Sequence, residues 1–337
     1  TSLRISALVT AMALAIGPAG ATDTTQSLLS DRLDQLTLAV TTRSDDALVM
    51  MISEAAMDPD LLPLERDQLM QAFIDRLRML PPDSVGPATL QFLLDYQPQA
   101  MRPDEHRPVV PVPVYNVGAA ARGLINGWRR EEAAYAGAIL LTRDPAALVH
   151  AFAMHDEAPV RRGLIAALNN ATRGQLEMIS FMALSAMDQE PALAALAGEA
   201  ALRIGDARAL EQLVRNGRGP AITHILRASR ERLSPEQVER LLDHAIDQAE
   251  PEVAAVAIAE LSPVLTGRPG ADDRLFALLG SKTLGATAAL SLAENPSDAT
   301  LVRLGEMLRG NDTTLAAKRA RLALELVEFQ GDTEVLP

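Results

Sequence analysis

The side chains that could perform acid–base or metal chemistry in this 337-residue chain are five histidines and many carboxylates, because the chain has no cysteine. His150 and His155 lie about 140° apart around a helix, whereas a zinc pair on one helix needs the i, i+4 spacing. His155 is followed by Asp156 and Glu157, but carboxylates are also the expected caps at a turn between helices. We therefore expect neither a metal site nor a cofactor. The other histidines are His106, His224 and His244.

Nucleophilic catalysis has no recognisable motif. The pattern G-x-S-x-G is absent, and no serine lies three residues before Lys282 or Lys318. A phosphate-binding loop follows a strand, and no strand is predicted before Gly217 and Gly219. These glycines are interpreted as a turn between helices. Paired carboxylates are common, but in a chain of formal net charge −13 they indicate a solvated surface. The sequence therefore predicts a protein that is not an enzyme.

One segment reverses the acidic balance of the chain. Residues 203–232 contain seven arginines and three carboxylates. The guanidinium fork suits carboxylate or phosphate, so this segment could dock an anionic partner or a lipid head group. The simpler interpretation is that these arginines pair with carboxylates of neighbouring helices. The candidate partner-binding residues are Arg203, Arg208, Arg215, Arg218, Arg227, Arg230 and Arg232.

A repeat of about thirty residues must position these side chains. Pro159, Pro191, Pro220 and Pro251 each open a run rich in small apolar residues. Proline in the first turn of a helix loses no hydrogen bond, so each run is predicted to be a helix. Similar runs without proline begin near Glu131, Lys282 and Asp312. The ten aromatic residues are few, which also favours closely packed helices over a β-sandwich.

Each repeat has a second helix with its own start signal. Ser234 is followed by Gln237 at the position that completes a capping box. We expect seven helix pairs between about residue 129 and the end of the chain, the last of them cut short. The predicted second helices begin at Asp144, Thr172, Asp206, Ser234, Asp272 and Ser297.

Residues 200–210 carry a family resemblance. The sequence AALRIGDARAL closes one helix with Ala-Leu, turns on Ile-Gly-Asp and opens the next helix with Ala-Leu. This pattern resembles the short HEAT-like repeat of phycobilisome lyase-like proteins. The resemblance extends over roughly residues 129–337, and it implies a right-handed α-solenoid. It transfers no catalytic residue, because the fold serves unrelated functions.

Two further regions precede the repeats. Residues 22–100 are predicted to form an N-terminal helical region, either degenerate repeats or a cap. Residues 101–118 contain four prolines and are predicted to run extended, as polyproline II or a short edge strand. That segment is either a functional loop or a spacer, and the HEAT-like repeats are expected over residues 119–337.

Residues 1–21 have the three zones of a secretory signal peptide. Arg4 precedes an apolar run over residues 5–16, and Gly17-Pro18 and the small residues 19–21 follow. The apolar run spans roughly 18 Å as a helix, less than the ~30 Å hydrocarbon core of a membrane. The alternative is a retained N-terminal helix or anchor. We expect a periplasmic or secreted protein whose mature chain is not inserted stably in the membrane.

The predicted fold is all-α, a right-handed α-solenoid of HEAT-like helix pairs. Solenoids expose long concave surfaces, expected here along the second helices, so the function we expect is a non-catalytic scaffold that binds a protein partner. The acidic balance argues against nucleic acid. One alternative is a lyase-like accessory protein that holds a small molecule in the solenoid groove. Another is a structural envelope protein.

Overall fold

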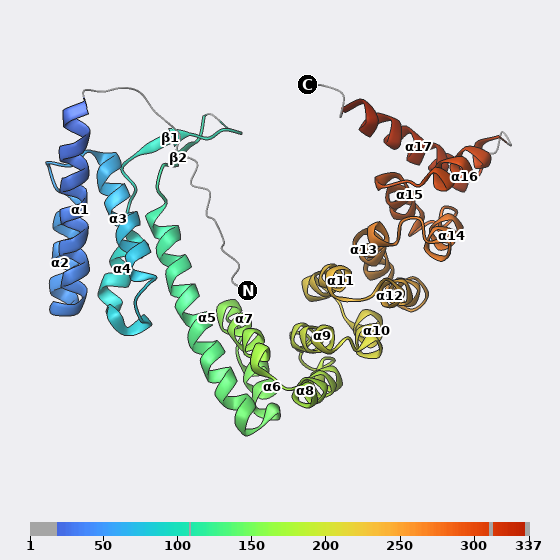
Figure 1. Ribbon diagram of the computed structural model, residues 1–337, viewed down its shortest axis with the longest axis horizontal. Coiled ribbons are helices and arrows are strands. Elements are labelled where there is room, and N and C mark those ends of the chain that lie inside the picture. Colours follow the sequence, from blue (N-terminus) through green and yellow to red (C-terminus); the bar gives the residue numbers. More distant parts are fainter. Residues whose placement is uncertain (1–18, 108, 310–312, 334–337) are drawn as a thin grey trace, which may run out of the picture. The chain divides into compact units, whose positions relative to one another are not determined.

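The computed structural model describes residues 19–107, 109–309 and 313–333, which are mostly helical (Figure 1). These residues form seventeen α-helices, packed largely between neighbours in the sequence, and one two-stranded sheet. The mostly α class is thereby confirmed. The chain divides into two compact units, Thr1–Arg129 and Arg130–Pro337, and the division falls inside helix α5 (Val117–Arg143).

The first unit has its own hydrophobic core. Ile52, Phe73 and Leu93 are fully buried, and Trp128 of α5 is 6% exposed in the same cluster. Helix α1 packs on α2 and α3, and α2 packs on α4. Its elements before α5 are α1 (Ala19–Thr42), α2 (Asp45–Ala56), α3 (Pro63–Leu77), a 3-10 turn (Pro82–Ser84), α4 (Pro87–Asp95), β1 (Met101–Pro103) and β2 (Pro111–Pro113).

Helix α4 is capped by a side chain from α2. Ser44 caps α2 itself, and the neighbouring Asp45 reaches across to the start of α4. The Asp45 carboxylate accepts hydrogen bonds from the backbone N–H of Gly86 (3.1 Å) and of Ala88 (2.8 Å), and from the backbone N–H and the hydroxyl of Thr89. A Cβ at Gly86 would lie 2.2 Å from an Asp45 oxygen, so only glycine admits this close approach. One carboxylate thus ties α2 to α4.

The Pro-rich residues 101–118 contain a β-hairpin. Strands β1 and β2 are antiparallel, with Met101 opposite Pro113 and Arg102 opposite Val112. Extended backbone was expected here, and the structure adds the pairing of the two strands. The hairpin is anchored at its base by the fully buried Asp67 of α3, whose carboxylate accepts from the backbone N–H of Gln99 (2.9 Å) and of Ala100 (2.8 Å).

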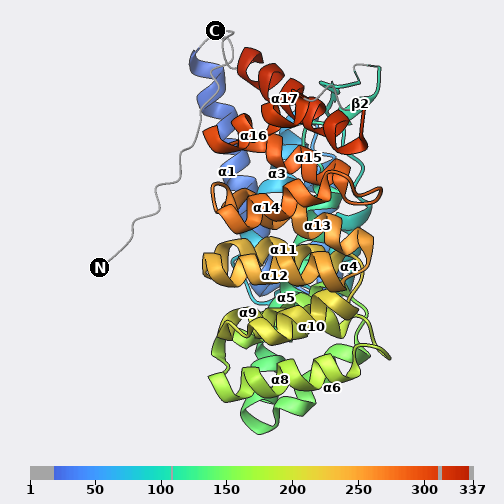
Figure 2. The same cartoon turned by 90° about the vertical axis from the view of Figure 1, so that its right-hand side faces the viewer.

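The second unit is an array of helix pairs. Helices α9, α11, α13, α15 and α17 each contact the next of that series, and α6, α8, α10, α12 and α14 form a second row. Figure 2 shows α8, α10, α12 and α14 one above another. Beyond α5, the helices are α6 (Pro145–Met154), α7 (Ala158–Ala167), α8 (Arg173–Ala186), α9 (Leu193–Ile204), α10 (Ala207–Asn216), α11 (Pro220–Arg232), α12 (Pro235–Gln248), α13 (Pro251–Leu261), α14 (Pro269–Leu278), α15 (Gly285–Glu294), α16 (Asp298–Leu308) and α17 (Leu315–Thr333). Two 3-10 turns, Leu168–Asn170 and Ser262–Leu265, follow α7 and α13.

Most predicted helix starts in this unit are confirmed. Five predicted starts are N-caps whose side chains accept a backbone hydrogen bond, and Ser234 with Gln237 forms the predicted capping box. Among the six predicted second helices one start is wrong: α14 begins at Pro269 and not at Asp272, because the fixed φ of proline suits the first turn of a helix. The run expected to begin near Glu131 also opens no helix, because it lies inside α5. The confirmed caps are Asp144, Thr172, Asp206, Ser234 and Ser297.

Small residues allow these helices to pack closely. Helix α9 buries nine of its twelve residues, most of them Ala, Leu or Gly. A Cβ at Gly163 of α7 would lie 2.2 Å from the backbone oxygen of Arg130 in α5. Gly205 ends α9 with φ +67°, a left-handed conformation in which glycine has no Cβ penalty. The low aromatic content therefore reflects tight contact between helices.

The predicted signal peptide lies largely outside the described residues, because only its residues 19–21 belong to the described chain, where they begin α1. Over the described ranges, no helix is both long and apolar enough to cross a membrane.

Candidate functional site

The seven arginines of residues 203–232 lie on three helices and one turn. Arg203 lies on α9, Arg208 and Arg215 lie on α10, and Arg218 lies in the following turn. The remaining three, Arg227, Arg230 and Arg232, lie on α11. The structure brings Arg203 and Arg232 together on one carboxylate oxygen of Glu199, and Arg227 and Arg230 both lie near Glu260.

Most of these arginines bond to a residue about one repeat away. Arg227 makes a two-pronged contact with Glu260, at 3.1 and 2.6 Å, and Arg218 donates to Glu250 at 3.1 Å. Arg215 Nη2 lies 3.3 Å from His244 Nε2. The partners are 29 to 33 residues apart in sequence, which is the spacing of the repeat. These contacts follow the simpler interpretation of the sequence, in which the arginines pair across neighbouring helices.

The series of side-chain contacts between neighbouring repeats, here called the ladder, continues toward the C-terminus. Arg274 of α14 contacts Asp243 and Asp247 of α12, and Arg303 of α16 contacts Asp273 of α14. Burial raises the pKa of Asp243 despite the opposing effect of Arg274. The hydrogen bonds of Arg227 lower the pKa of Glu260, with a smaller contribution from Arg230. These ion pairs therefore connect helices that are neighbours in the array.

Two adjacent helices of the second row carry exposed large apolar side chains, which we call the apolar patch: Met154 on α6, and Met178 and Phe181 on α8. Phe181 is 72% exposed, Met154 is 68% exposed and Met178 is 48% exposed, although each lies on a helix packed in the array. Phe181 and Arg215 both lie nine residues after the N-cap of their helices, α8 and α10, which pack together. Arg208 and Arg215 thus lie on the helix that packs next to α8, and Arg208 is exposed and makes no hydrogen bond or ion pair with another described residue.

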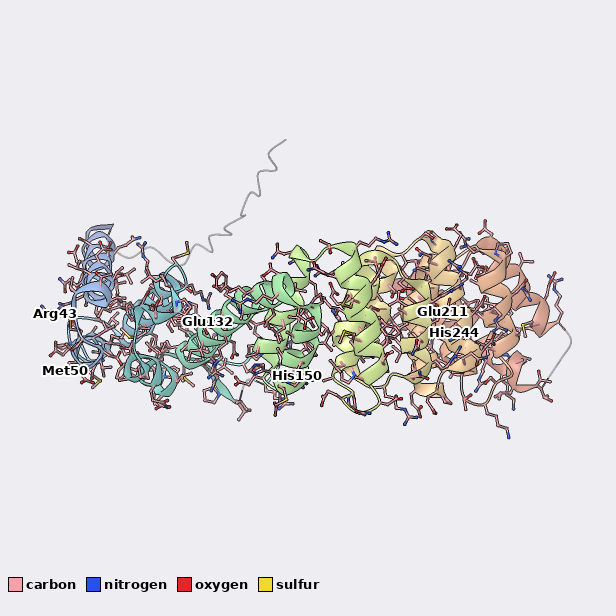
Figure 3. All side chains as sticks on the ribbon, turned by 90° about the horizontal axis from the view of Figure 1, so that it is seen from below. Arg43, Met50, Glu132, His150, Glu211 and His244 are labelled. Atoms are coloured by element: carbon pink, nitrogen blue, oxygen red, sulfur yellow. The ribbon has the colours of Figure 1, made fainter. Side chains whose placement is uncertain are left out.

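The histidines do not converge on a site. His150 on α6 and His244 on α12 lie well apart along the second unit (Figure 3). His155 lies exposed between α6 and α7, beside Asp156 and Glu157. Among the residues that the structure describes, no group of three His, Asp or Glu side chains could hold a metal ion.

The first unit contains a groove with apolar residues in its lining. A groove of about 560 Å³ lies between the end of α2 and helix α4, with Met57 and Phe92 among its lining residues. Tyr96 also lines it, and its hydroxyl donates to the buried Asp67 at 2.8 Å. Burial and this hydrogen bond raise the pKa of Tyr96 well above its ordinary range. The groove offers apolar surface, and Ser53 and Asp95 are among its polar lining residues.

Sequence reasoning missed three of these features: the apolar patch, the Glu199 cluster and the Asp67 network. The apolar patch carries a signal, since exposed Met and Phe can be inferred from the helix period. The Glu199 cluster carries part of one, because arginine–carboxylate pairs recur at the repeat spacing but that spacing does not show which arginines share a carboxylate. The Asp67 network carries none, because Asp67 and Tyr96 belong to no common pattern in the sequence.

Comparison with known proteins gives no relative. No family model, no curated protein and no solved structure matches this chain.

Proposed function

We propose that this chain is a non-catalytic scaffold that binds a protein partner, built as a right-handed α-solenoid of HEAT-like helix pairs. The observation that carries the proposal is the apolar patch of Met154, Met178 and Phe181. Three large apolar side chains are left exposed on two helices that pack against each other. Met178 and Phe181 are three residues apart and share one face of α8, and exposed apolar surface marks interaction sites.

The positive charges on the neighbouring helix α10 determine the partner chemistry that we expect. Arg208 and Arg215 lie on the next helix of the row, so a segment with apolar side chains followed by carboxylates would complement both regions. Arginine and aromatic residues are the types that contribute most to protein interfaces. On the sequence evidence of residues 1–21, we place this scaffold in the periplasm or outside the cell.

A site-specific cross-link tests the proposal. A photo-reactive phenylalanine analogue is placed at Phe181, and the matched control places it at Leu290, which is 55% exposed on α15 in the other row. We expect position 181 alone to capture a protein in the native cells, through a peptide rich in apolar and acidic residues. We also expect Met178→Asp to abolish the product.

Two outcomes would contradict the proposal. One is an equal yield of the same product from positions 181 and 290, which would indicate non-specific contact. The other is a product at position 181 that persists at full yield in the Met178→Asp variant, because the apolar patch would then not be the surface that binds.

A further inference from the structure

The ends of α9 and α11 form a polar cluster around one buried carboxylate. Glu199 is 7% exposed, and its Oε1 accepts from Arg203 Nε at 2.9 Å and from Arg232 Nη1 at 2.9 Å. Arg203 Nη1 also donates to Asn169 Oδ1, at 2.7 Å, from the turn after α7. Helices α9 and α11 and the turn after α7 therefore contribute to this cluster.

The charge balance of the cluster differs from that of the rest of the ladder. Arg274 contacts two carboxylates, and so does Arg268, which contacts Glu236 and Glu239. At Glu199 the ratio is reversed, because two guanidinium groups form ion pairs with one carboxylate; Glu260 has one such ion pair, with Arg227, and Arg230 nearby. One positive charge is thus left without a direct counter-charge.

The cluster also lines a cleft and has N–H donors without a hydrogen bond. It lines an open cleft of about 460 Å³, together with Leu202 and Asn169. A guanidinium group has five N–H donors. Arg203 Nη2 and both Arg232 Nε and Nη2 make no hydrogen bond within the described part of the chain. These donors remain available to a further acceptor in the cleft.

We propose that this cleft binds a carboxylate group. A planar carboxylate can accept two parallel N–H bonds from one guanidinium fork, and such charge-assisted pairs are the strong ones. A second carboxylate would bring the cluster to two arginines and two carboxylates. The carboxylate is carried by a small free acid or by an acidic side chain of a peptide. The site belongs to α9, α11 and the turn after α7, so it does not depend on the apolar patch.

The test follows the arginine Nε–Hε signals of the full chain by NMR during titration at constant ionic strength. The two probes are malonate, for a free acid, and the dipeptide N-acetyl-Glu-Glu, for a peptide-borne carboxylate. We expect a saturable shift of the Arg203 and Arg232 signals. Whichever probe saturates at the lower concentration identifies the source of the carboxylate.

Variants with opposite expected effects separate binding from a structural role. Arg232→Gln is expected to weaken binding by about tenfold or more, the loss typical of one charged hydrogen bond. Glu199→Gln removes the internal competitor and is expected to tighten binding. Arg173→Gln, which removes an exposed guanidinium in another ion pair, is the matched control and should change nothing. A shift that never saturates, or an unchanged affinity in Arg232→Gln, would overturn the proposal.

Discussion

At the scale of single residues, the hydrogen bond between Tyr96 and Asp67 should stabilise the first unit at neutral pH and be lost at alkaline pH. The Tyr96 hydroxyl donates to the buried Asp67 carboxylate, and burial together with this bond raises the pKa of Tyr96. A raised pKa means that the stabilisation is complete below the unfolded pKa of about 10 and is lost as the pH rises further. We expect Tyr96→Phe to cost about 1.5–3 kcal/mol at pH 8, as for other hydrogen bonds to charged groups, and less above pH 10.

Urea unfolding followed by Trp128 fluorescence measures this cost, because the chain has a single tryptophan and it lies in the core of the first unit. The matched control is Tyr115→Phe, because the hydroxyl of Tyr115 has no hydrogen bond to another described residue. A cost of Tyr96→Phe that is equal at pH 8 and at pH 10.5 would contradict the assignment. Neither Asp67 nor Tyr96 could be selected from the sequence, because their contact depends on how α3 meets the segment after α4.

At the scale of helices, local signals predict where most helices of the second unit begin, because capping chemistry acts within three or four residues. Ser234 and Gln237 complete a capping box that the sequence alone predicts. The cap of α4 could not be predicted, because its acceptor, Asp45, lies more than forty residues earlier in the chain. The sequence likewise predicts extended backbone at residues 101–118 and not the register of β1 with β2, because proline restricts φ without selecting a partner strand.

Replacement of Asp45 tests the cap between α2 and α4. Partial burial disfavours the charged carboxylate, but bonds from Thr89, Ala88 and Gly86 outweigh it and lower the pKa of Asp45. The stabilisation is therefore present above the unfolded pKa of about 3.9 and is lost as the pH falls through the folded pKa. We expect Asp45→Ala to destabilise the first unit by about 1–2 kcal/mol at pH 7, as for other lost caps. The measurement is again urea unfolding at Trp128.

Asp46→Ala is the matched control, since Asp46 is the next residue of the same first turn and is exposed. It should cost less than about 0.5 kcal/mol, the usual limit for a surface substitution. If Asp45→Ala and Asp46→Ala cost the same, the stabilisation would come from the helix dipole of α2 and not from the bonds to α4.

At the scale of the whole molecule, the mostly α class and the pairing of helices are confirmed, whereas the HEAT-like solenoid stays a prediction. The thirty-residue period predicts which residues are neighbours, and the bonds of Arg218 and Arg227 to residues 32 and 33 positions later follow that period. The charge excess at Glu199 could not be predicted, because it depends on which arginine of each repeat points to the same carboxylate. A period fixes the neighbours of a residue but not the direction of its side chain.

An array in which each helix packs mainly on its sequence neighbours should also lose structure locally. Leu304 of α16 and Leu213 of α10 are both fully buried leucines, one near the end of the array and one in its middle. Each Leu→Ala change should cost about 2–5 kcal/mol in local stability. Native-state hydrogen exchange is expected to show that Leu304→Ala loosens α14 to α17 and leaves α8 to α12 protected. Leu213→Ala should instead raise exchange on both sides of α10, because the helices beyond it lose a neighbour in either direction. Equal acceleration throughout residues 145–309 in both variants would mean that the second unit unfolds as a single cooperative block, and that its stability is not a sum of contacts between adjacent pairs.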